Sequence, residues 1–331
     1  MGVPKRWIFL LLIGPLFSSM IACEQTGTIE SIKLAHGLTK DHAVHKGMVD
    51  FAERVAEKSE GRLSIQIYPN GQLGSESQCL ELLQIGSLGI TKVSAAVMES
   101  FAPQYKVLGI PYIFKNDEHR YKVYDGPIGR EILDSGQKYW LKGLCFYDAG
   151  SRSFYTKDKP IRTASDLAGM KIRVMKSITA NKMISEMGGS PVPIAWGELY
   201  TALQQGVVDG AENNPPSFHL SRHYETSKYY TLDKHTSIPD VMVISTKIWK
   251  RLSTEQKRWV MEAASESVLV QRDYWKESEE ESLRVVKEAG IEVIEPDLGS
   301  FQEATRAIVD EFAKSEELKD LILRIQKGNA Q

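Results

Sequence analysis

The stretch STEQKRWVMEAASESVLVQRDYWKESEEESLRVVKEAG, residues 253–290, contains no proline, and its only glycine is the last residue. Its start matches a capping box, in which Ser253 and Gln256 bond free backbone amides of a helix. A helix over 254–289 is about 54 Å long, which exceeds the width of a domain of about 150 residues. Two interpretations fit: one helix shared by two halves of the molecule, or two helices separated by an unmarked kink. We favour the shared helix because its apolar surface suffices for both halves, with Trp259, Val260, Leu269, Val270, Tyr274 and Trp275.

Two runs of alternating strands and helices precede this stretch in a chain of 331 residues, a length that favours two domains. The first run predicts strands at 28–36, 63–67 and 90–93, with helices at 44–55 and 75–85. The pattern restarts near Leu144 with strands at 144–147, 153–156, 171–175 and 209–212, a capped turn at 163–167, and helices at 179–187 and 196–204. This order is typical of α/β domains with a largely parallel sheet.

The domain boundaries follow from these two runs and from the long helix. We expect a first α/β domain over 28–148 together with about 236–270. A second α/β domain covers 149–235 together with about 271–331. The chain first crosses between them near 143–150, and a ligand cleft is expected between the domains.

The composition excludes several classes of protein. Hydrophobic residues make up 42% of the chain and charged residues 25%, which is ordinary for a globular protein and excludes disorder. The net charge of −2, without a basic run, gives no electrostatic footprint for nucleic acid. The three cysteines, Cys23, Cys79 and Cys145, form no C-x-x-C pair, so neither a thiolate zinc site nor a disulfide framework is expected.

The N-terminus reads as an export signal. Lys5 and Arg6 precede an apolar run over 7–17, which is too short to span a membrane and is typical of a secretory signal peptide at 1–22. Residues 20–23, MIAC, resemble the bacterial lipobox, in which the cysteine is acylated and becomes the new N-terminus. Met20 stands where leucine is usual. Acylation of Cys23 is therefore one interpretation and ordinary cleavage near Ala22 the other; both place the protein in the periplasm.

Motifs for catalysis and for cofactors are missing from the sequence. It contains no G-x-S-x-G, H-E-x-x-H, P-loop or G-x-G-x-x-G pattern, so we expect no enzymatic activity and no cofactor. His219 and His223 are four residues apart, a spacing that suits a metal on one helical face. No carboxylate completes that set, and the same holds for His42 and His45, so no metal site is expected.

Polar residues at the ends of apolar strands are candidates for binding a small anion. Arg173 lies in the apolar strand 171–175, and Arg152 lies just before Phe154. Arginine suits carboxylates because its planar fork donates two parallel hydrogen bonds. Asn213 and Lys92 follow two other strands, where α/β proteins bind ligands. The competing interpretation makes the three cations solvated strand-end charges and Asn213 part of a turn.

Three runs resemble one known family. They are PNGQLG at 69–74, DLAGMKIR at 166–173, and the segment from Gly188 through PVP at 191–193 to ALQQGVVDG at 202–210. In this order they resemble the solute-binding proteins of tripartite ATP-independent periplasmic (TRAP) transporters, over about 29–325. The resemblance implies a two-domain, hinged fold of the periplasmic-binding-protein type, with a long helix crossing both domains. It also implies a monomeric receptor whose partners are a small and a large integral membrane subunit.

The same resemblance assigns roles to individual residues. Arg173 matches the position that pairs with a ligand carboxylate, and Arg152 matches a second arginine position that often reaches the same ligand. Asn213 matches the position that hydrogen-bonds the ligand opposite the arginine. These roles are implied by the family and not by spacing.

The ligand is expected to be an acidic sugar. The segments TKVS at 91–94, HAVH at 42–45 and ENNPPSF at 212–218, together with His36, resemble the branch that binds hexuronates such as glucuronate and galacturonate. Lys92 joins the two arginines in the cationic clamp, and the hydroxyl partners are Glu76, Asn213, His36 and His42. A buried Glu76 repels a second ligand carboxylate but accepts from hydroxyls. Trp196 is a candidate for stacking on a sugar face. The alternatives are a receptor for a C4-dicarboxylate or another organic acid, and an exported enzyme or signalling module on the same fold.

Overall fold

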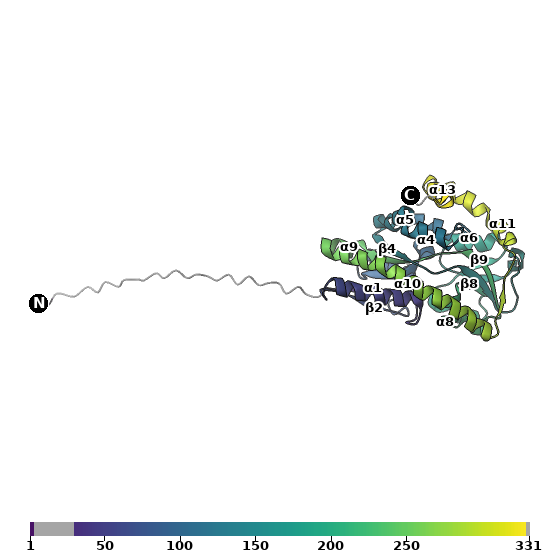
Figure 1. Cartoon of the computed structure of the whole chain (residues 1–331), viewed down its shortest axis with the longest axis horizontal. Coiled ribbons are helices and arrows are strands. Elements are labelled where there is room, and N and C mark those ends of the chain that lie inside the picture. Colours follow the sequence, from purple (N-terminus) through teal and green to yellow (C-terminus); the bar gives the residue numbers. More distant parts are fainter. Residues whose placement is uncertain (3–29, 329–331) are drawn as a thin grey trace.

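The computed structural model describes residues 1–2 and 30–328 (Figure 1). Apart from its first two residues, the predicted signal peptide lies outside the described residues, as does the candidate acylation site Cys23. The same holds for the first two residues of the strand predicted at 28–36. Across 30–328, none of the helices is both long enough and apolar enough to cross a membrane.

Two β-sheets divide the molecule into two halves. The first sheet has the order β2-β1-β3-β10-β4 and the second the order β11-β9-β5-β8-β6-β7. The strands of the first sheet are β1 (Glu30–Ala35), β2 (Leu63–Tyr68), β3 (Ile90–Ser94), β4 (Leu141–Tyr147) and β10 (Asp240–Ser245). Those of the second are β5 (Arg152–Thr156), β6 (Lys171–Val174), β7 (Ser190–Pro193), β8 (Gly210–Asn213), β9 (Tyr229–Thr236) and β11 (Glu292–Ile294).

The prediction of a largely parallel sheet holds only in part, because both sheets are mixed. In the first sheet, β1 pairs in parallel with β2 and β3, but β10 runs antiparallel to both β3 and β4. In the second sheet, β5 runs antiparallel to both β8 and β9. The physical reason lies in the crossovers at 148–151 and 237–239. After each crossover the next strand begins beside the last residue of its neighbour, so the two strands run in opposite directions. Asp240, the first residue of β10, for example, lies opposite Ser94, the last residue of β3.

The long helix is confirmed. Helix α10 (Thr254–Glu288) is continuous, and Ser253 and Gln256 form the expected capping box. It packs against α1 (Ala43–Lys58) and β4 in the first half and against α8 (Pro215–Leu220) in the second. Figure 1 shows it extending beside both halves. The predicted sharing of one helix between two halves therefore holds, and no kink interrupts it.

One side chain of α10 forms two hydrogen bonds with the backbone of the crossover between the halves. The Gln271 amide nitrogen donates to the Asp148 carbonyl oxygen at 2.8 Å, and the Gln271 Oε1 accepts from the Asp148 backbone nitrogen at 2.8 Å. A Cβ on Gly47 would lie 2.7 Å from the Gln271 side chain, so the close approach of α1 to α10 requires glycine there. The second crossover is tied to the first by Ser151 and Ser237, whose hydroxyls are 3.0 Å apart.

Most other predicted elements are present with shifted ends. They include α2 (Glu76–Ile85), capped by Ser75, α6 (Ile178–Glu186), and the turn η3 (Ala164–Leu167), capped by Thr163. The helix predicted at 196–204 is split into η4 (Trp196–Glu198) and α7 (Leu199–Gln204). Elements that the patterns left unassigned are α3 (Ala95–Met98), η1 (Pro103–Gly109), α4 (Asp117–Asp125), α5 (Pro127–Ser135), η2 (Gly136–Tyr139), η5 (His223–Thr226), α9 (Thr246–Arg251), α11 (Gly299–Thr305), α12 (Ala307–Phe312), α13 (Glu316–Lys327), β9, β10 and β11.

The C-terminal helices depart from the predicted domain boundary. Helix α11 packs against η3, α6 and β9 of the second half, but α13 packs against η1 and α5, which belong to the first. The amphipathic α13 buries Leu318, Leu321, Ile322 and Ile325 there. Residues 316–327 therefore lie on the first half, although they fall within the range predicted for the second domain.

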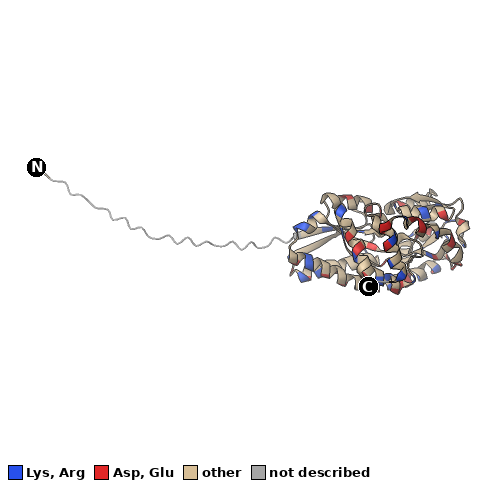
Figure 2. Cartoon of the chain, turned by 90° about the horizontal axis from the view of Figure 1, so that it is seen from above, with Lys and Arg blue, Asp and Glu red and all other residues tan. Residues whose placement is uncertain are grey.

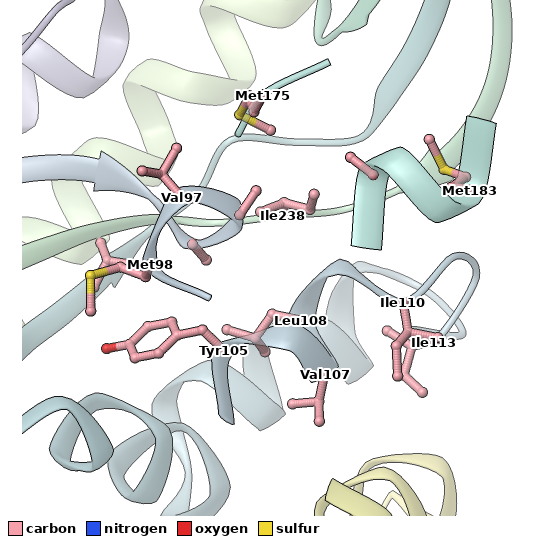
Figure 3. Packing of buried hydrophobic residues seen from close by; sticks show 14 of the residues in the cluster. Val97, Met98, Tyr105, Val107, Leu108, Ile110, Ile113, Met175, Met183 and Ile238 are labelled. Atoms are coloured by element: carbon pink, nitrogen blue, oxygen red, sulfur yellow. The ribbon is translucent and has the colours of Figure 1, made fainter. Parts of the chain in front are cut away.

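An apolar cluster continues from one half into the other beneath the cleft. Figure 3 shows Val97, from α3, together with Met175, which follows β6, and Ile238, from the second crossover. All three side chains are at most 8% exposed. Residues from three separated segments thus form one continuous apolar wall of the cleft. The polar side chains described below line its other walls.

Candidate functional site

A cavity of about 340 Å³ lies between the two halves, where the strand ends and crossovers meet. Its size falls in the range of small-molecule sites. Six of the seven predicted site residues line it, namely His42, Glu76, Lys92, Arg152, Arg173 and Asn213. Trp196 also lines the cavity. A Cβ on Gly37 in the opposite half would lie 3.5 Å from the Trp196 ring, so this side chain reaches across the cavity edge from one half to the other.

Arg173 is a buried cation that forms no ion pair with any residue the structure describes. Its side chain, on β6, is 1% exposed and is the largest fully buried one among the described residues. The Nε atom donates to the Ile194 carbonyl oxygen at 2.9 Å, whereas Nη1 is buried with no hydrogen-bond partner within 30–328. The guanidinium lies 5.9 Å from the Trp196 ring centroid. Burial lowers the pKa of Arg173, and the Arg152 charge lowers it further. A carboxylate in the cavity would satisfy the outer edge of this guanidinium.

Arg152, in contrast, is largely satisfied by the protein. It donates from Nε and Nη2 to the Glu212 carboxylate, from Nη2 to the Glu212 carbonyl oxygen at 2.7 Å, and from Nη1 to Asn213 Oδ1 at 2.8 Å. Pairing of β5 with β8 sets this geometry, because it puts Phe154 opposite Glu212 and Ser153 opposite Asn213. Of the five donor hydrogens of arginine, one on Nη1 remains for a ligand.

Glu212 belongs to a buried charge network that sequence reasoning missed. Its carboxylate lies 3.4 Å from Nε2 of His235, whose Nδ1 lies 2.7 Å from Asp233. Burial works to raise the pKa of Glu212, but Arg152 and His235 outweigh it and lower that pKa to about 2. Burial works to lower the pKa of His235, but Asp233 and Glu212 raise it to about 9. The sequence did offer a signal for Glu212, because it is a glutamate directly before Asn213 in a predicted strand. A buried arginine needs a carboxylate partner, and this residue could have been considered for that role.

The opposite side of the cavity is acidic. Lys92 Nζ donates to Glu76 Oε1 at 3.1 Å and to Asp240 Oδ1 at 3.2 Å. Burial works to lower the pKa of Lys92, but Asp240 and Glu76 outweigh it, so that pKa is raised. The other oxygens, Glu76 Oε2 and Asp240 Oδ2, accept no hydrogen bond within the described chain. Asp240 escaped prediction because no strand was expected at 240–245.

His42 presents a hydrogen-bond donor to the cavity. As the N-cap of α1, it accepts at Nδ1 from the Val44 backbone nitrogen at 3.2 Å. Burial, followed by the Lys92 charge, lowers its pKa to about 3, so the ring is neutral and carries its hydrogen on Nε2. That Nε2 is buried and has no partner among residues 30–328.

His36 does not line the cavity, contrary to the prediction that it contacts the ligand. Its Nδ1 accepts from the Leu38 backbone nitrogen at 3.1 Å, and its Nε2 lies 3.0 Å from His45 Nδ1. Both ring nitrogens are thus engaged by the protein. Gly37 and Leu38, which follow His36, do line the cavity, but the alternation over 28–36 did not reveal that the His36 side chain turns away.

Both histidines of the pair His219 and His223, considered for metal, are engaged by the fold. His219 Nδ1 lies 3.1 Å from the Ser282 hydroxyl, and His223 Nδ1 lies 2.8 Å from the Tyr155 hydroxyl. Within 30–328, no group of three or more His, Cys, Asp or Glu side chains is placed to hold a metal ion. Cys79 and Cys145 are buried free thiols.

The stability of the protein is expected to peak near pH 7. The pKa values of His36, His42 and His223 are lowered to about 2, 3 and 3, primarily by burial. Below pH 6.5 the unfolded chain therefore binds protons that the folded chain does not, and stability falls with falling pH. His235 has the opposite shift, so its contribution is lost as the pH rises from about 6.5 to 9.

Denaturant titrations from pH 5 to 9 measure this profile. Three histidines held neutral correspond to a loss on the order of 3 kcal/mol between pH 7 and 5.5. His235→Gln is expected to remove the decline above pH 7 and to retain the fall in stability at acid pH. A free energy of unfolding that stays level from pH 5.5 to 7 would contradict the buried, neutral state of these rings.

Comparisons with known proteins agree with this architecture. The family model of the bacterial extracellular solute-binding proteins, family 7, matches residues 34–316. A TRAP periplasmic solute-binding protein of Bradyrhizobium sp. BTAi1, solved with D-galacturonate, has a TM-score of 0.89 and 38% identity, covering 90% of this chain and 100% of that one. Its counterpart from Roseobacter denitrificans, solved with β-D-glucuronate, has a TM-score of 0.87 and 37% identity, covering 90% and 99%. An uncharacterised protein of Salmonella typhimurium is 41% identical over 83% of this chain and 84% of its own.

Proposed function

The chain belongs to the bacterial extracellular solute-binding proteins, family 7, as a TRAP solute receptor, and on this premise we propose that its cavity binds a hexuronate such as galacturonate or glucuronate. The observation that carries the proposal is the buried guanidinium of Arg173, whose Nη1 has no partner within 30–328. The family membership supports the receptor role. The ligands of the two solved relatives support the choice of sugar acid.

The ligand carboxylate occupies the outer edge of Arg173. Two parallel, charge-assisted hydrogen bonds from Nη1 and Nη2 satisfy the donors that the protein leaves open. Arg152 supplies its remaining Nη1 hydrogen to the same group, and Asn213 donates from Nδ2, because Asn213 Oδ1 is already occupied by Arg152 and by the Asn214 backbone nitrogen. Arg173 therefore carries most of the binding energy, and Arg152 and Asn213 set the orientation.

The sugar hydroxyls face the acidic side of the cavity. Glu76 Oε2 and Asp240 Oδ2 accept from them, and His42 Nε2 donates to a hydroxyl or ring oxygen. Trp196 lies along the cavity wall, where its ring can cover the apolar face of a pyranose. This division, with a cation at one end and acceptors at the other, fits a molecule with one carboxylate and several hydroxyls.

A C4-dicarboxylate fits the same division poorly. Its second carboxylate would lie beside Glu76 and Asp240, and Lys92 is already shared between those two acids. Like charges at close range in a partly buried site are costly. The alternative of a dicarboxylate receptor is thereby disfavoured by charge.

The receptor works by closing around its ligand and returning it unchanged. The two crossovers and α10 connect the halves, so a rotation there opens or covers the cavity. We propose that the mature chain acts in the periplasm as a monomer, anchored by acylated Cys23. It delivers the sugar acid to a small and a large membrane subunit, with no catalysis and no cofactor.

A thermal-shift screen tests the ligand assignment. The chain from residue 24 onward, which keeps every helix and strand, is heated with glucuronate, galacturonate, succinate, malate or neutral sugars. A ligand at about 1,000 times its Kd adds roughly 4 kcal/mol, which raises the midpoint by several degrees. We expect shifts with hexuronates alone. Shifts confined to dicarboxylates would refute the roles of Glu76 and Asp240, and recovery of a chemically altered sugar would refute the receptor role.

A further inference from the structure

The end of the first half that lies farthest from the cavity exposes two large apolar side chains. Trp140 is 52% exposed and Ile85 is 63% exposed. Three segments converge there: the Gln84 amide donates to the Tyr139 carbonyl oxygen at 3.0 Å, and the Thr246 backbone nitrogen donates to the Trp140 carbonyl oxygen at 3.1 Å. We call this surface the basic pole; it consists of Ile85, Lys138, Trp140, Lys247, Trp249, Lys250, Arg251 and Lys257.

Trp140 is held in a backbone conformation that its residue type avoids. Its φ is 63°, in the left-handed region that favours glycine. The backbone hydrogen bonds to Gln137 and Thr246 maintain this conformation and leave the indole outside the core. A bulky aromatic residue in such a position is a reason to look for a binding role.

Cations without acidic partners surround these apolar groups. Lys138, Lys247, Lys250, Arg251 and Lys257 form no salt bridge within 30–328. Lys257 and Lys142 stand 5.9 and 5.6 Å from the centroid of the Trp249 ring. Two nearby acids are already paired, Asp134 with Lys142 and Glu255 with Arg62. Figure 2 shows Lys and Arg residues concentrated at this end of the folded body.

The described fold begins at the same end. Strand register aligns Leu34 of β1 with Ile90 of β3 and Ile90 with Ile244 of β10, so Glu30 lies beyond them, away from the cavity. Leu141, which follows Trp140, pairs with Ser245 at that end. Because β1 and β4 are three strands apart, the start of the fold and Trp140 are roughly 14 Å apart across the sheet.

The distance to Cys23 limits which surface can face a membrane. Six residues lie between Cys23 and Glu30, and the seven steps along the chain can span at most about 24 Å. An acyl chain on Cys23 would therefore keep Glu30, and the pole around it, within that distance of the lipid headgroups. The cavity, at the opposite end of the sheet, would stay accessible.

We propose that the basic pole rests on an anionic phospholipid surface and holds the free receptor against the membrane. The lysines and Arg251 bind headgroup phosphates, and the Trp140 indole enters the interfacial layer, where amphipathic rings are favoured. Each such cation contributes about a fivefold increase in binding, from about 1 kcal/mol per Lys or Arg at an anionic membrane surface. The inference does not depend on which sugar the cavity binds.

Vesicle sedimentation tests the proposal without sugar and without the acyl chain. The chain from residue 24 onward is mixed with vesicles of phosphatidylcholine containing 30 mol% phosphatidylglycerol, or of phosphatidylcholine alone. We expect binding only to the anionic vesicles. The variant Lys138→Glu/Lys250→Glu/Arg251→Glu changes exposed side chains without hydrogen bonds and is expected to bind at least about 100-fold more weakly.

A matched variant separates the pole from overall charge. Lys276→Glu/Lys287→Glu/Lys314→Glu changes three exposed lysines elsewhere that form no salt bridge within 30–328, and is expected to lose less than about tenfold. Brominated lipids are expected to quench the wild-type fluorescence and to quench Trp140→Phe much less. Equal losses in both triple variants, or no preference for anionic vesicles, would overturn the proposal. So would a pole variant that fails only in capturing the membrane subunits, which would make the pole a protein-docking surface.

Discussion

Arg173→Ala is expected to weaken hexuronate binding by at least about 100-fold. Each charge-assisted hydrogen bond contributes roughly 1.5–3 kcal/mol, and the guanidinium edge of Arg173 that lies toward the cavity can offer two in parallel. Neither Arg152 nor Lys92 can replace it. Arg152 is committed to Glu212 and Asn213, and Lys92 to Glu76 and Asp240.

The stability of Arg173→Ala without ligand is expected to be unaffected, in contrast to its affinity for the ligand. Arg173 is buried without an anion in the described chain, and a buried unpaired charge costs free energy. We therefore expect Arg173→Ala to unfold at a temperature no lower than the wild type, while ligand no longer raises the midpoint. Such a result assigns the charge to ligand binding, because a structural arginine would lower both.

Isothermal calorimetry measures the change in affinity. Arg173→Lys keeps the charge but lacks the planar fork, so it should bind more weakly than the wild type and better than alanine. Arg162→Ala is the matched control, because Arg162 lies on the same half, is exposed, and pairs with Glu292. Less than a threefold change for Arg173→Ala would exclude the proposed clamp.

Glu212→Gln is expected to destabilise the protein by about 3–5 kcal/mol, the largest stability effect anticipated for any single substitution here. The carboxylate compensates two buried cations, Arg152 and His235, and the glutamine amide can neutralise neither. The unfolding midpoint should fall by roughly 10 °C. Loss of this carboxylate also lowers the pKa of His235, so the alkaline decline in stability should be smaller and should end at a lower pH.

Two variants make this prediction specific. Glu292→Gln breaks the exposed pair with Arg162 and is expected to cost less than about 1 kcal/mol. Arg152→Met/Glu212→Leu removes both members of the buried pair and should be less harmful than Glu212→Gln, since no charge is left stranded on Arg152. A Glu212→Gln protein as stable as the wild type would show that the network is not compensated in this way.

Local chemistry made several features of this protein predictable. The capping box at Ser253, followed by 36 residues without an internal breaker, predicted α10 almost to its ends. Ser75 caps α2 and Thr163 caps η3, as the sequence predicted. The apolar runs also predicted Arg173 within a strand and Asn213 at the end of another, and strand ends in α/β proteins lie at the ligand edge of the sheet.

Pairings between distant segments were beyond the reach of these patterns. Lys92 meets Asp240, 148 positions away, only because β10 returns from the other half and lies beside β3. The same return makes the sheet mixed instead of parallel. His36 follows the expected strand, yet its ring pairs with His45 and leaves the cavity to His42. None of these contacts leaves a periodic trace in the sequence.

The sequence by itself determined the local elements, the long helix and the kinds of side chain available for an acidic ligand. Hydrogen bonding and apolar burial within a few turns decide such features, and they repeat with a period that can be read along the chain. Only the tertiary structure decided which of the charged side chains are already paired within the protein. Arg152 and Arg173 look alike in sequence, but β5 and β8 bring Glu212 to one of them and leave the other open to the cavity. Electrostatic pairing acts through space, so it depends on strand order and not on distance along the chain.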